Sequence, residues 1–314
     1  MRMMHCEFQQ FTHASLAAAL AGFGLPSGIF WLYFSGSILL VVGLVKILKD
    51  ELPQTHGLDK IMPFGRLFLA IPLAVFGTEH FTNTADVAKS VPRWFPAHAF
   101  WVYLVGIALI AAALSITVQI RSPLAATLLG AMFFSFVLLI DIPGLKAHPS
   151  NRFFWALTLR EIAFSGGAFA YAGSPGRSGR TRGVPGLVTV GRFFVALPAV
   201  FYGVEHFLHP EFAPGVPLAK VIPVWVPGRV PWAYLAGTVL VAAGVALLIN
   251  KKARMAAICL GLMILLLVLF VYLPILVVSP TDLESLNYFF DTLLFSGAAL
   301  VLGDALPKED HPHV

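Results

Sequence analysis

Apolar residues gather into nine runs of roughly 20 residues along the chain, each bounded by proline, glycine or charge. A helix of about 20 apolar residues spans the hydrocarbon core of a bilayer. The pattern therefore predicts an all-α, polytopic integral membrane protein with about nine transmembrane helices. The expected spans lie near residues 27–48, 62–82, 98–120, 123–142, 153–173, 187–208, 230–249, 254–277 and 284–304.

Composition leads to the same class of protein. Of the 314 residues, 58% are hydrophobic and 12% charged, and the mean hydropathy is +0.82. An ordinary soluble domain has about 25% charged residues, so a soluble enzyme is excluded. The net charge is +5, but the basic residues stand in short segments between apolar runs, which argues against nucleic acid as a partner. Cys6 and Cys259 show no motif spacing, so no disulfide framework or iron–sulfur cluster is expected.

The distribution of basic residues predicts the orientation, because Lys and Arg near span ends remain on the cytoplasmic side. Connecting segments alternate between basic-rich and basic-poor. We expect a multi-pass protein of the cytoplasmic (inner) membrane of a prokaryote, with the N-terminus outside and the C-terminus inside. The set expected inside contains Lys46, Lys49, Lys60, Arg121, Arg177, Arg180, Arg182, Lys251, Lys252, Arg254 and Lys308, and the set expected outside contains Lys89, Arg93, Lys146, Arg152, Lys220 and Arg229.

The N-terminal segment, residues 1–60, is expected to contain one transmembrane helix and a shorter apolar stretch, Ala14–Leu25. That stretch has the length of a signal-peptide core. However, only Arg2 provides a preceding positive charge, and no clear cleavage site follows. We favour an interfacial or re-entrant helix that ends at Gly22, Gly24 and Pro26.

The remaining sequence contains an internal duplication. Residues 77–81 read Gly-Thr-Glu-His-Phe and residues 203–207 read Gly-Val-Glu-His-Phe, a separation of 126 residues (205 − 79). After a five-residue insertion, the loops 91–96 and 222–227 share a Val/Ile-Pro-x-Trp-x-Pro pattern at a separation of 131 (225 − 94). The register then holds as far as Phe-Ser-Gly at 164–166 and 295–297.

This duplication predicts two tandem four-helix repeats. Each copy has an even number of spans, so both copies enter the membrane from the same side and form parallel repeats about an axis along the membrane normal. The predicted organisation is the N-terminal segment 1–60, a first repeat 61–173, a basic linker 174–186, a second repeat 187–306 and a tail 307–314.

A four-helix unit with Gly-x-x-His-Phe closing its first helix and a Val-Pro-x-Trp-x-Pro loop resembles the DoxX/DoxD-like family of membrane proteins. The resemblance covers both copies, roughly residues 61–305. It implies a redox-associated subunit that binds a quinone or similar apolar ligand near the outer membrane face and acts with a redox partner protein. This chain differs by its two fused units, its extra helix and its lack of paired cysteines, which puts thiosulfate oxidation in doubt.

Charged residues inside the apolar runs are the main candidates for chemistry, because charges within a membrane are costly and usually paired. Arg160 and Glu161 are expected well inside the fourth span of the first copy, and Asp291 and Thr292 are their equivalents in the second. Arg160 could pair with Asp291 across the two copies, or with Glu79 within its own. The candidate ligand-binding residues are Arg160, Glu161, Asp291, Glu79 and Glu205.

These charges allow three interpretations. They line a pocket for a quinone head group in the leading hypothesis, or they line the pathway of a small-molecule or ion transporter. In the third interpretation they form a structural ion pair in a scaffold without catalytic activity.

Histidines at the expected outer ends of the spans suggest one more possibility. Each Gly-x-Glu-His-Phe sequence places a histidine beside a carboxylate, and His209 follows one turn after the second. Imidazole and carboxylate together suit zinc, copper or iron, and two histidines can hold a haem. The alternative is that these histidines anchor helices at the membrane interface. The candidate metal ligands are His80, His206 and His209.

Overall fold

The computed structural model describes residues 26–174, 183–216 and 220–308. Within these ranges the chain is helical, and the only β pairing is an isolated bridge between Phe212 and Val221. The expected interfacial helix over residues 14–25 and the arginines of the basic linker lie outside the described residues.

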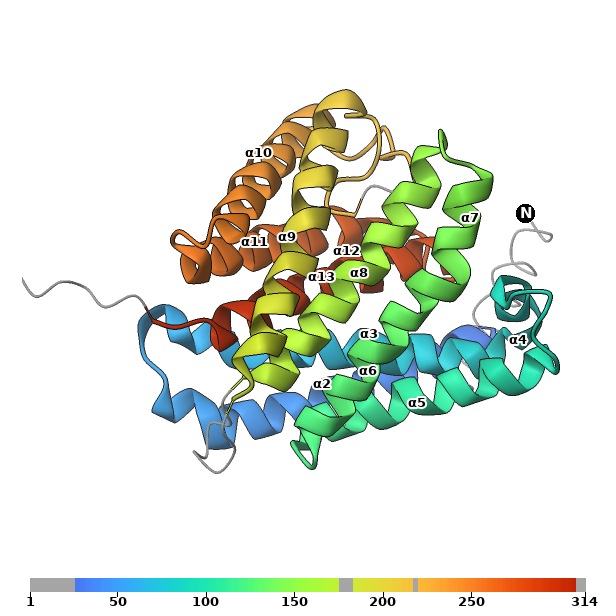
Figure 1. The fold of residues 1–314 in the computed structure, drawn as a ribbon, viewed down its shortest axis with the longest axis horizontal. Coiled ribbons are helices and arrows are strands. Elements are labelled where there is room, and N and C mark those ends of the chain that lie inside the picture. The colour runs from blue at the N-terminus through green and yellow to red at the C-terminus, as the bar shows by residue number, and fades with distance from the viewer. Residues whose placement is uncertain (1–25, 175–182, 217–219, 309–314) are drawn as a thin grey trace, which may run out of the picture.

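Helices occupy all nine predicted spans (Figure 1). Eight helices in the described part are long and apolar enough to cross a membrane. The exception among the predicted spans is the 22-residue helix α8, which is lower in hydropathy because it includes Arg152, Arg160 and Glu161. The main helices are α2 (Ser27–Lys46), α3 (Met62–Thr82), α5 (His98–Val118), α6 (Ser122–Phe136), α7 (Ile142–Ala147), α8 (Arg152–Gly173), α9 (Pro185–Leu208), α10 (Arg229–Leu248), α11 (Ala253–Leu267), α12 (Leu273–Val278) and α13 (Leu283–Ala305).

Two of the long helices contain a π-helical segment at matching positions. Segment η5 (Val137–Asp141) joins α6 to α7, and η6 (Val268–Tyr272) joins α11 to α12, a separation of 131 residues (268 − 137). A π segment adds a residue to the turn and rotates the side chains that follow it, and such segments are frequent at functional sites. Asp141 and Tyr272 therefore hold equivalent places at the ends of these segments.

Side-chain hydrogen bonds repeat with the same separation. Ser165 on α8 donates to the Gly130 carbonyl on α6 at 2.8 Å, and Ser296 on α13 donates to the Gly261 carbonyl on α11 at 2.8 Å. Each bond satisfies a buried hydroxyl and joins two helices, which is an important form of contact between helices that share an apolar environment.

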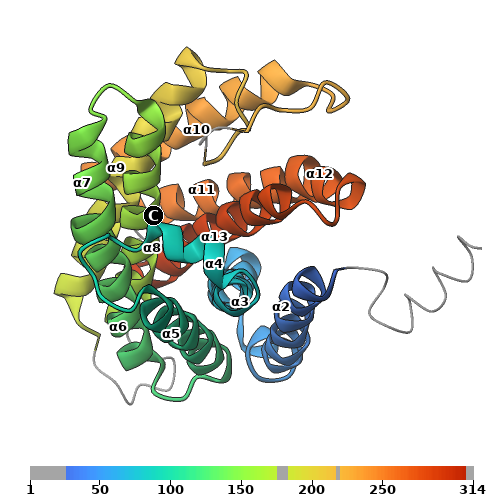
Figure 2. The ribbon, with the colours of Figure 1, turned by 90° about the vertical axis from the view of Figure 1, so that its right-hand side faces the viewer.

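The two sets of helices interleave. Helix α3 packs extensively on α5 and on α13, whereas α9 packs on α10 and on α8. The first helix of each predicted repeat thus lies against the last helix of the other repeat. Helices α8 and α13 contact each other at the centre of the molecule (Figure 2). A charged side chain of α8 or α13 that faces the centre consequently lies between the two halves.

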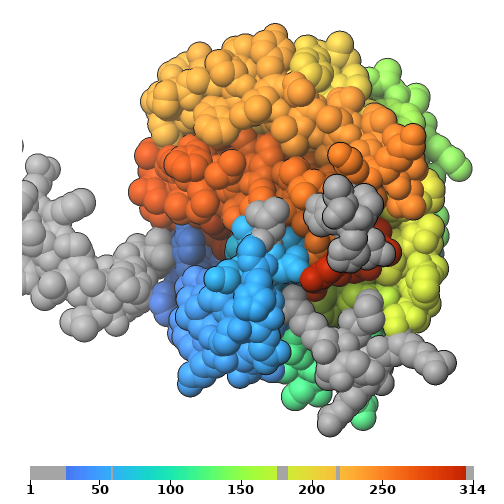
Figure 3. Space-filling view, turned by 90° about the vertical axis from the view of Figure 1, so that its left-hand side faces the viewer, coloured from blue at the N-terminus to red at the C-terminus, as the bar shows by residue number. Residues whose placement is uncertain are grey.

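The N-terminal helix α2 packs on α3 and is fixed at its C-terminal end by polar contacts. Lys46 donates to the Val118 carbonyl at the end of α5, 3.0 Å away. Glu51, in the π segment η1 (Ile47–Glu51) that follows α2, forms a buried two-point ion pair with Arg66 of α3. The connections after α2, between α10 and α11, and after α13 meet at this end of the molecule (Figure 3).

Candidate functional site

Arg160 lies at the centre of a cluster of polar side chains between α8 and α13. Its Nη1 donates to Asp291 Oδ2 at 2.7 Å and its Nη2 donates to Glu161 Oε1 at 2.9 Å. The side chains of Arg160, Glu161 and Asp291 are 20%, 12% and 7% exposed. The expected pairing of Arg160 with Asp291 across the two halves is therefore confirmed. The alternative pairing with Glu79 is not formed.

Glu79 instead accepts a hydrogen bond from Asn287, one turn before Asp291 on α13, at 3.2 Å. It remains close enough to Arg160 and Asp291 to interact with both charges. Asp141 reaches the cluster from η5 and interacts with Arg160 and Glu161. Neither Asp141 nor Asn287 is among the candidates from the sequence, although an acidic residue at the end of an apolar run is a usable signal for Asp141.

Several buried atoms of this cluster have no hydrogen-bond partner among the residues that the structure describes. They are Arg160 Nε, Glu161 Oε2, Asp141 Oδ2 and Asn287 Oδ1. Buried polar atoms are nearly always paired with protein or water, and leaving one unpaired costs about 1–3 kcal/mol. A cluster that served only to join helices would be expected to satisfy its own atoms. The observed set offers one donor and three acceptors to a further molecule.

The cluster contains more acid than base. Four carboxyl groups, those of Glu79, Asp141, Glu161 and Asp291, surround one guanidinium. A low-dielectric interior does not hold several uncompensated negative charges, because each isolated ion loses its hydration without an opposite partner. Some of these carboxyl groups must consequently carry a proton, so the cluster can gain or lose protons when its contacts change.

The ends of α3 and α9 that carry the two Glu-His pairs have the same local structure. The ring Nδ1 of His80 bonds the Phe76 carbonyl at 2.7 Å, and the ring Nδ1 of His206 bonds the Tyr202 carbonyl in the same way. Phe81 stacks on Tyr103, with ring centroids 5.6 Å apart, as Phe207 stacks on Tyr234 at 5.9 Å.

Glycines bring the neighbouring helices together at both places. A Cβ on Gly106 would lie 2.9 Å from His80 Cβ, and a Cβ on Gly237 would lie 3.0 Å from His206 Cβ. His80 and His206 are therefore equivalent in position as well as in sequence.

The two Glu-His pairs do not come together. Figure 1 shows α3 ending beside α4 (Thr84–Val87) at one edge of the molecule, whereas α9 ends at another edge. Glu205 pairs with Arg152 of α8 at 2.7 Å, while Glu79 faces α13. Each glutamate thus contacts the last helix of the other half, but at a separate place.

The metal hypothesis finds no support in this geometry. His206 uses both ring nitrogens in hydrogen bonds, because its Nε2 accepts from the Gly215 N–H at 2.9 Å. His209 Nδ1 lies 3.3 Å from Glu211 Oε1. Over residues 26–174, 183–216 and 220–308, no three His, Cys, Asp or Glu side chains are grouped so that they could hold a metal ion. His80, His206 and His209 are consequently not grouped in the described structure as three ligands of one metal ion.

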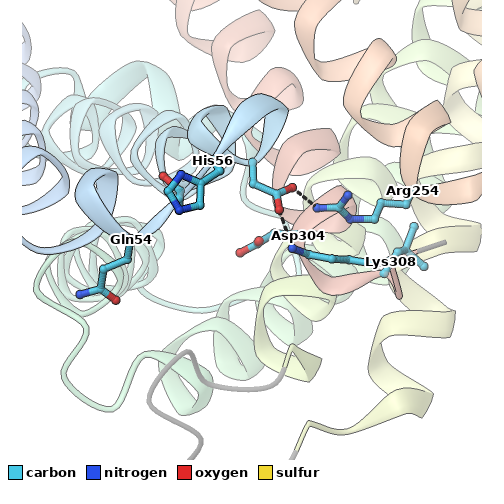
Figure 4. Close-up of a pocket in the computed structure, with 8 residues that line it drawn as sticks. Gln54, His56, Arg254, Asp304 and Lys308 are labelled. Carbon is cyan, nitrogen blue, oxygen red and sulfur yellow. Dashed lines mark hydrogen bonds and ion pairs between the residues drawn. The ribbon is translucent and has the colours of Figure 1, made fainter. Parts of the chain in front are cut away.

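A second polar site lies at the opposite end of the bundle (Figure 4). Asp59 there accepts from Arg254 at 2.5 Å and from Lys308 at 2.6 Å, which links the start of α3, the start of α11 and the end of α13. The adjoining cavity has a volume of about 290 Å³. Its lining residues are Gln54, Thr55, His56, Asp59, Arg254, Asp304, Leu306 and Lys308.

Comparison with known proteins yields one match. A family model described as a domain of unknown function, DUF8561, matches residues 69–142. This stretch runs from α3 to the residue after η5 and includes Glu79, His80 and Asp141. No curated protein and no solved structure matches the chain.

Proposed function

We propose that this membrane protein binds a quinone-type ligand at the Arg160 cluster and that binding is linked to protonation of the cluster. The observation that carries the proposal is the set of unpartnered buried atoms on Arg160, Glu161 and Asp141. A quinone reaches such a site through the lipid, because the molecule is apolar apart from its head group. The head group offers oxygens to Arg160 Nε, and its reduced form offers hydroxyl protons to the carboxylates.

The proposal includes a membrane arrangement that follows the sequence prediction. The protein is a DoxX-like subunit with nine spans, in which α8 is the ninth, and with two parallel four-helix repeats preceded by α2. The matched π segments and serine hydrogen bonds support the repeats. The N-terminus is outside and the C-terminus inside the cytoplasmic membrane of a prokaryote, so the Glu-His ends of α3 and α9 face outward. A redox partner protein exchanges the ligand's electrons.

A second candidate function is proton-coupled transport of a small solute or ion. The excess of carboxyl groups over arginine at the centre favours it, because such a cluster exchanges protons. In this arrangement, the polar cavity beside Asp59 at the opposite end of the bundle is a further polar position for the solute.

Binding measurements on the purified protein in detergent test the proposal. Short-chain benzoquinone and naphthoquinone, in oxidised and reduced form, are titrated against tryptophan fluorescence. The wild-type protein is expected to bind at least one of them, and Arg160→Leu/Asp291→Leu is expected to weaken binding at least about tenfold. Arg93→Leu is the control, since it removes an exposed arginine from a loop at the outer ends of the helices. Absence of binding by all four ligands would overturn the proposal, and proton-driven flux in liposomes that needs Glu161 or Asp291 would favour transport.

A further inference from the structure

The protein's own backbone occupies the position beside His206 in the second half. The peptide group between Pro214 and Gly215 donates its N–H to His206 Nε2 at 2.9 Å and accepts from the Tyr272 hydroxyl at 2.5 Å. His206 and Tyr272 are each 1% exposed. One peptide group, clamped between a histidine and a tyrosine, therefore satisfies both side chains.

The backbone conformation and the burial of the loop hold this peptide group in place. Gly215 has φ +109°, which a residue with a side chain rarely adopts, and a Cβ there would lie 3.2 Å from Thr292. Ala213, Val216 and Ile222 of the same loop are buried. The loop fills the outer end of the second half and is part of its core.

The first half has the same histidine and a different loop. His80 bonds the Phe76 carbonyl through Nδ1, and no described residue bonds its Nε2. Asp141 stands at the place of Tyr272, 4% exposed, with Oδ2 unpartnered. The connection between α3 and α5, residues 83–97, is five residues shorter than the connection between α9 and α10, residues 209–228. The first half thus has a shorter connection after its histidine than the connection that carries the Pro214–Gly215 peptide group in the second half.

We propose that His80 and Asp141 form the head-group subsite of the first half, and that this subsite selects the reduced, hydroxyl-bearing form of the ligand over the oxidised form. The Pro214–Gly215 peptide group of the second half shows which contact a ligand would replace. This inference rests on the quinone-type ligand proposed above and adds which redox form is bound and by which residues.

The tautomer of His80 decides the selectivity. Because a carbonyl only accepts, His80 Nδ1 must be the protonated nitrogen, and Nε2 of the neutral ring is then an acceptor. A ligand that bonds Nε2 has to donate, as the Gly215 N–H does to His206. A quinol hydroxyl donates, whereas a quinone carbonyl only accepts. When its carboxyl is ionised, Asp141 likewise only accepts, so its unpartnered oxygen favours the same hydroxyl donor.

The exchange of Tyr272 for Asp141 fits a ring-shaped ligand. A tyrosine places its hydroxyl beyond a six-membered ring, whereas an aspartate ends one carbon past Cβ. Asp141 and Tyr272 hold equivalent positions on η5 and η6, and the Asp141 side chain is shorter by about one aromatic ring. A quinol ring supplies the same shape together with the donor groups.

The test compares the dissociation constants of one short-chain quinone in its reduced and oxidised forms, measured without oxygen on the purified protein. The wild-type protein is expected to bind the reduced form at least about tenfold more tightly, the value of one hydrogen bond that only one form can make. His80→Leu is expected to remove this preference by weakening the binding of the reduced form alone. The control is His148→Leu, which replaces an exposed histidine at the same end of the helices.

Asp141→Asn provides a second variant, with a side chain of nearly unchanged size. We expect it to weaken binding of the reduced form several-fold, while the melting temperature of the protein stays close to that of the wild type. Equal or tighter binding of the oxidised form would overturn this inference but leave the proposed function intact. A His80→Leu variant that keeps the wild-type preference would likewise overturn this inference and leave the proposed function intact. Failure of both forms to bind would overturn the proposed function as well.

Discussion

Arg160 and Asp291 occupy equivalent positions on α8 and α13, 131 residues apart in the sequence, and form a hydrogen-bonded ion pair of 2.7 Å. A position that is basic in one half is acidic in the other, so the two central helices complement each other. The same arginine also bonds Glu161 at 2.9 Å. The ion pair therefore joins the two halves and organises the remaining carboxyl groups around one positive charge.

Substitutions in this pair are expected to show strong coupling. Arg160→Leu leaves two carboxylates without their partner and should cost about 3–5 kcal/mol of unfolding free energy. Asp291→Leu should cost less, because Arg160 retains Glu161. The double variant Arg160→Leu/Asp291→Leu should be more stable than the sum of the single losses predicts. Denaturation of the purified proteins in detergent, followed by tryptophan fluorescence, measures all three values. Additive losses would contradict a direct pair.

The two equivalent histidines are expected to differ in their contribution to stability. His206 bonds a helix carbonyl as His80 does, but it also accepts from the Gly215 N–H and is buried, so His206→Leu leaves that buried N–H unpaired. A loss of about 1–3 kcal/mol follows from the unpaired N–H. His80→Leu removes one bond to a helix carbonyl and should cost less than about 1 kcal/mol. Thermal unfolding of both variants checks this. Equal losses would show that His80 has a structural role like that of His206.

Much of the fold follows from the sequence because the membrane fixes the length of its elements. The predicted boundaries of the runs near 62–82 and 284–304 agree closely with α3 and α13, since a helix must satisfy its own backbone in lipid. The Arg160–Asp291 pair could be predicted because the 131-residue register places opposite charges at one position. This reasoning needs only the sequence and the cost of an unpaired charge.

The remaining features of the site depend on local geometry that hydropathy does not encode. A π segment turns Asp141 toward Arg160 and Glu161, and a run of apolar residues gives no sign of that extra residue. The alignment shows the five-residue insertion in the second loop, but not that Gly215 turns its N–H toward His206. The two Glu-His motifs match in sequence and in local structure, but the sequence does not show that α3 and α9 end at separate edges of the molecule.

The N-terminus of α13 provides a prediction about pH. Asp282 caps the helix by accepting from the Ser285 N–H at 3.0 Å and from the Ser285 hydroxyl. The hydrogen bond from the Ser285 side chain holds the pKa of Asp282 below its usual range, against a smaller opposing effect of burial. A depressed pKa means that the stabilisation is present at neutral pH and is lost as the pH falls through the folded-state value.

Asp282→Asn keeps a capping side chain but does not titrate. The stability difference between the wild type and this variant should therefore shrink as the pH falls from 7 to about 3. Asn151 caps α8 at the equivalent position, accepting from the Phe153 N–H at 3.0 Å. Its replacement, Asn151→Ala, should cost about 1 kcal/mol at every pH in this range. Melting temperatures across the pH series give both comparisons, and a constant difference for Asp282→Asn would refute the assignment.

The closest helix contact at the end that carries His206 depends on Gly203. A Cβ at this position would lie 2.5 Å from Val241 Cγ2 and 2.9 Å from the Gly237 carbonyl oxygen, so α9 and α10 would have to separate. Gly203→Ala is expected to cost about 1–3 kcal/mol, the usual penalty of overpacking. Gly186, near the start of the same helix, has no atom of the described residues within 4 Å of such a Cβ. Gly186→Ala should be neutral or stabilising by about 0.5–1 kcal/mol, because alanine favours helix. Unfolding in a series of detergent mixtures with increasing dodecyl sulfate compares the two variants at matched composition. If Gly203→Ala unfolded at the wild-type midpoint, the close packing of α9 on α10 would be incorrect, and with it the equivalence of His80 and His206.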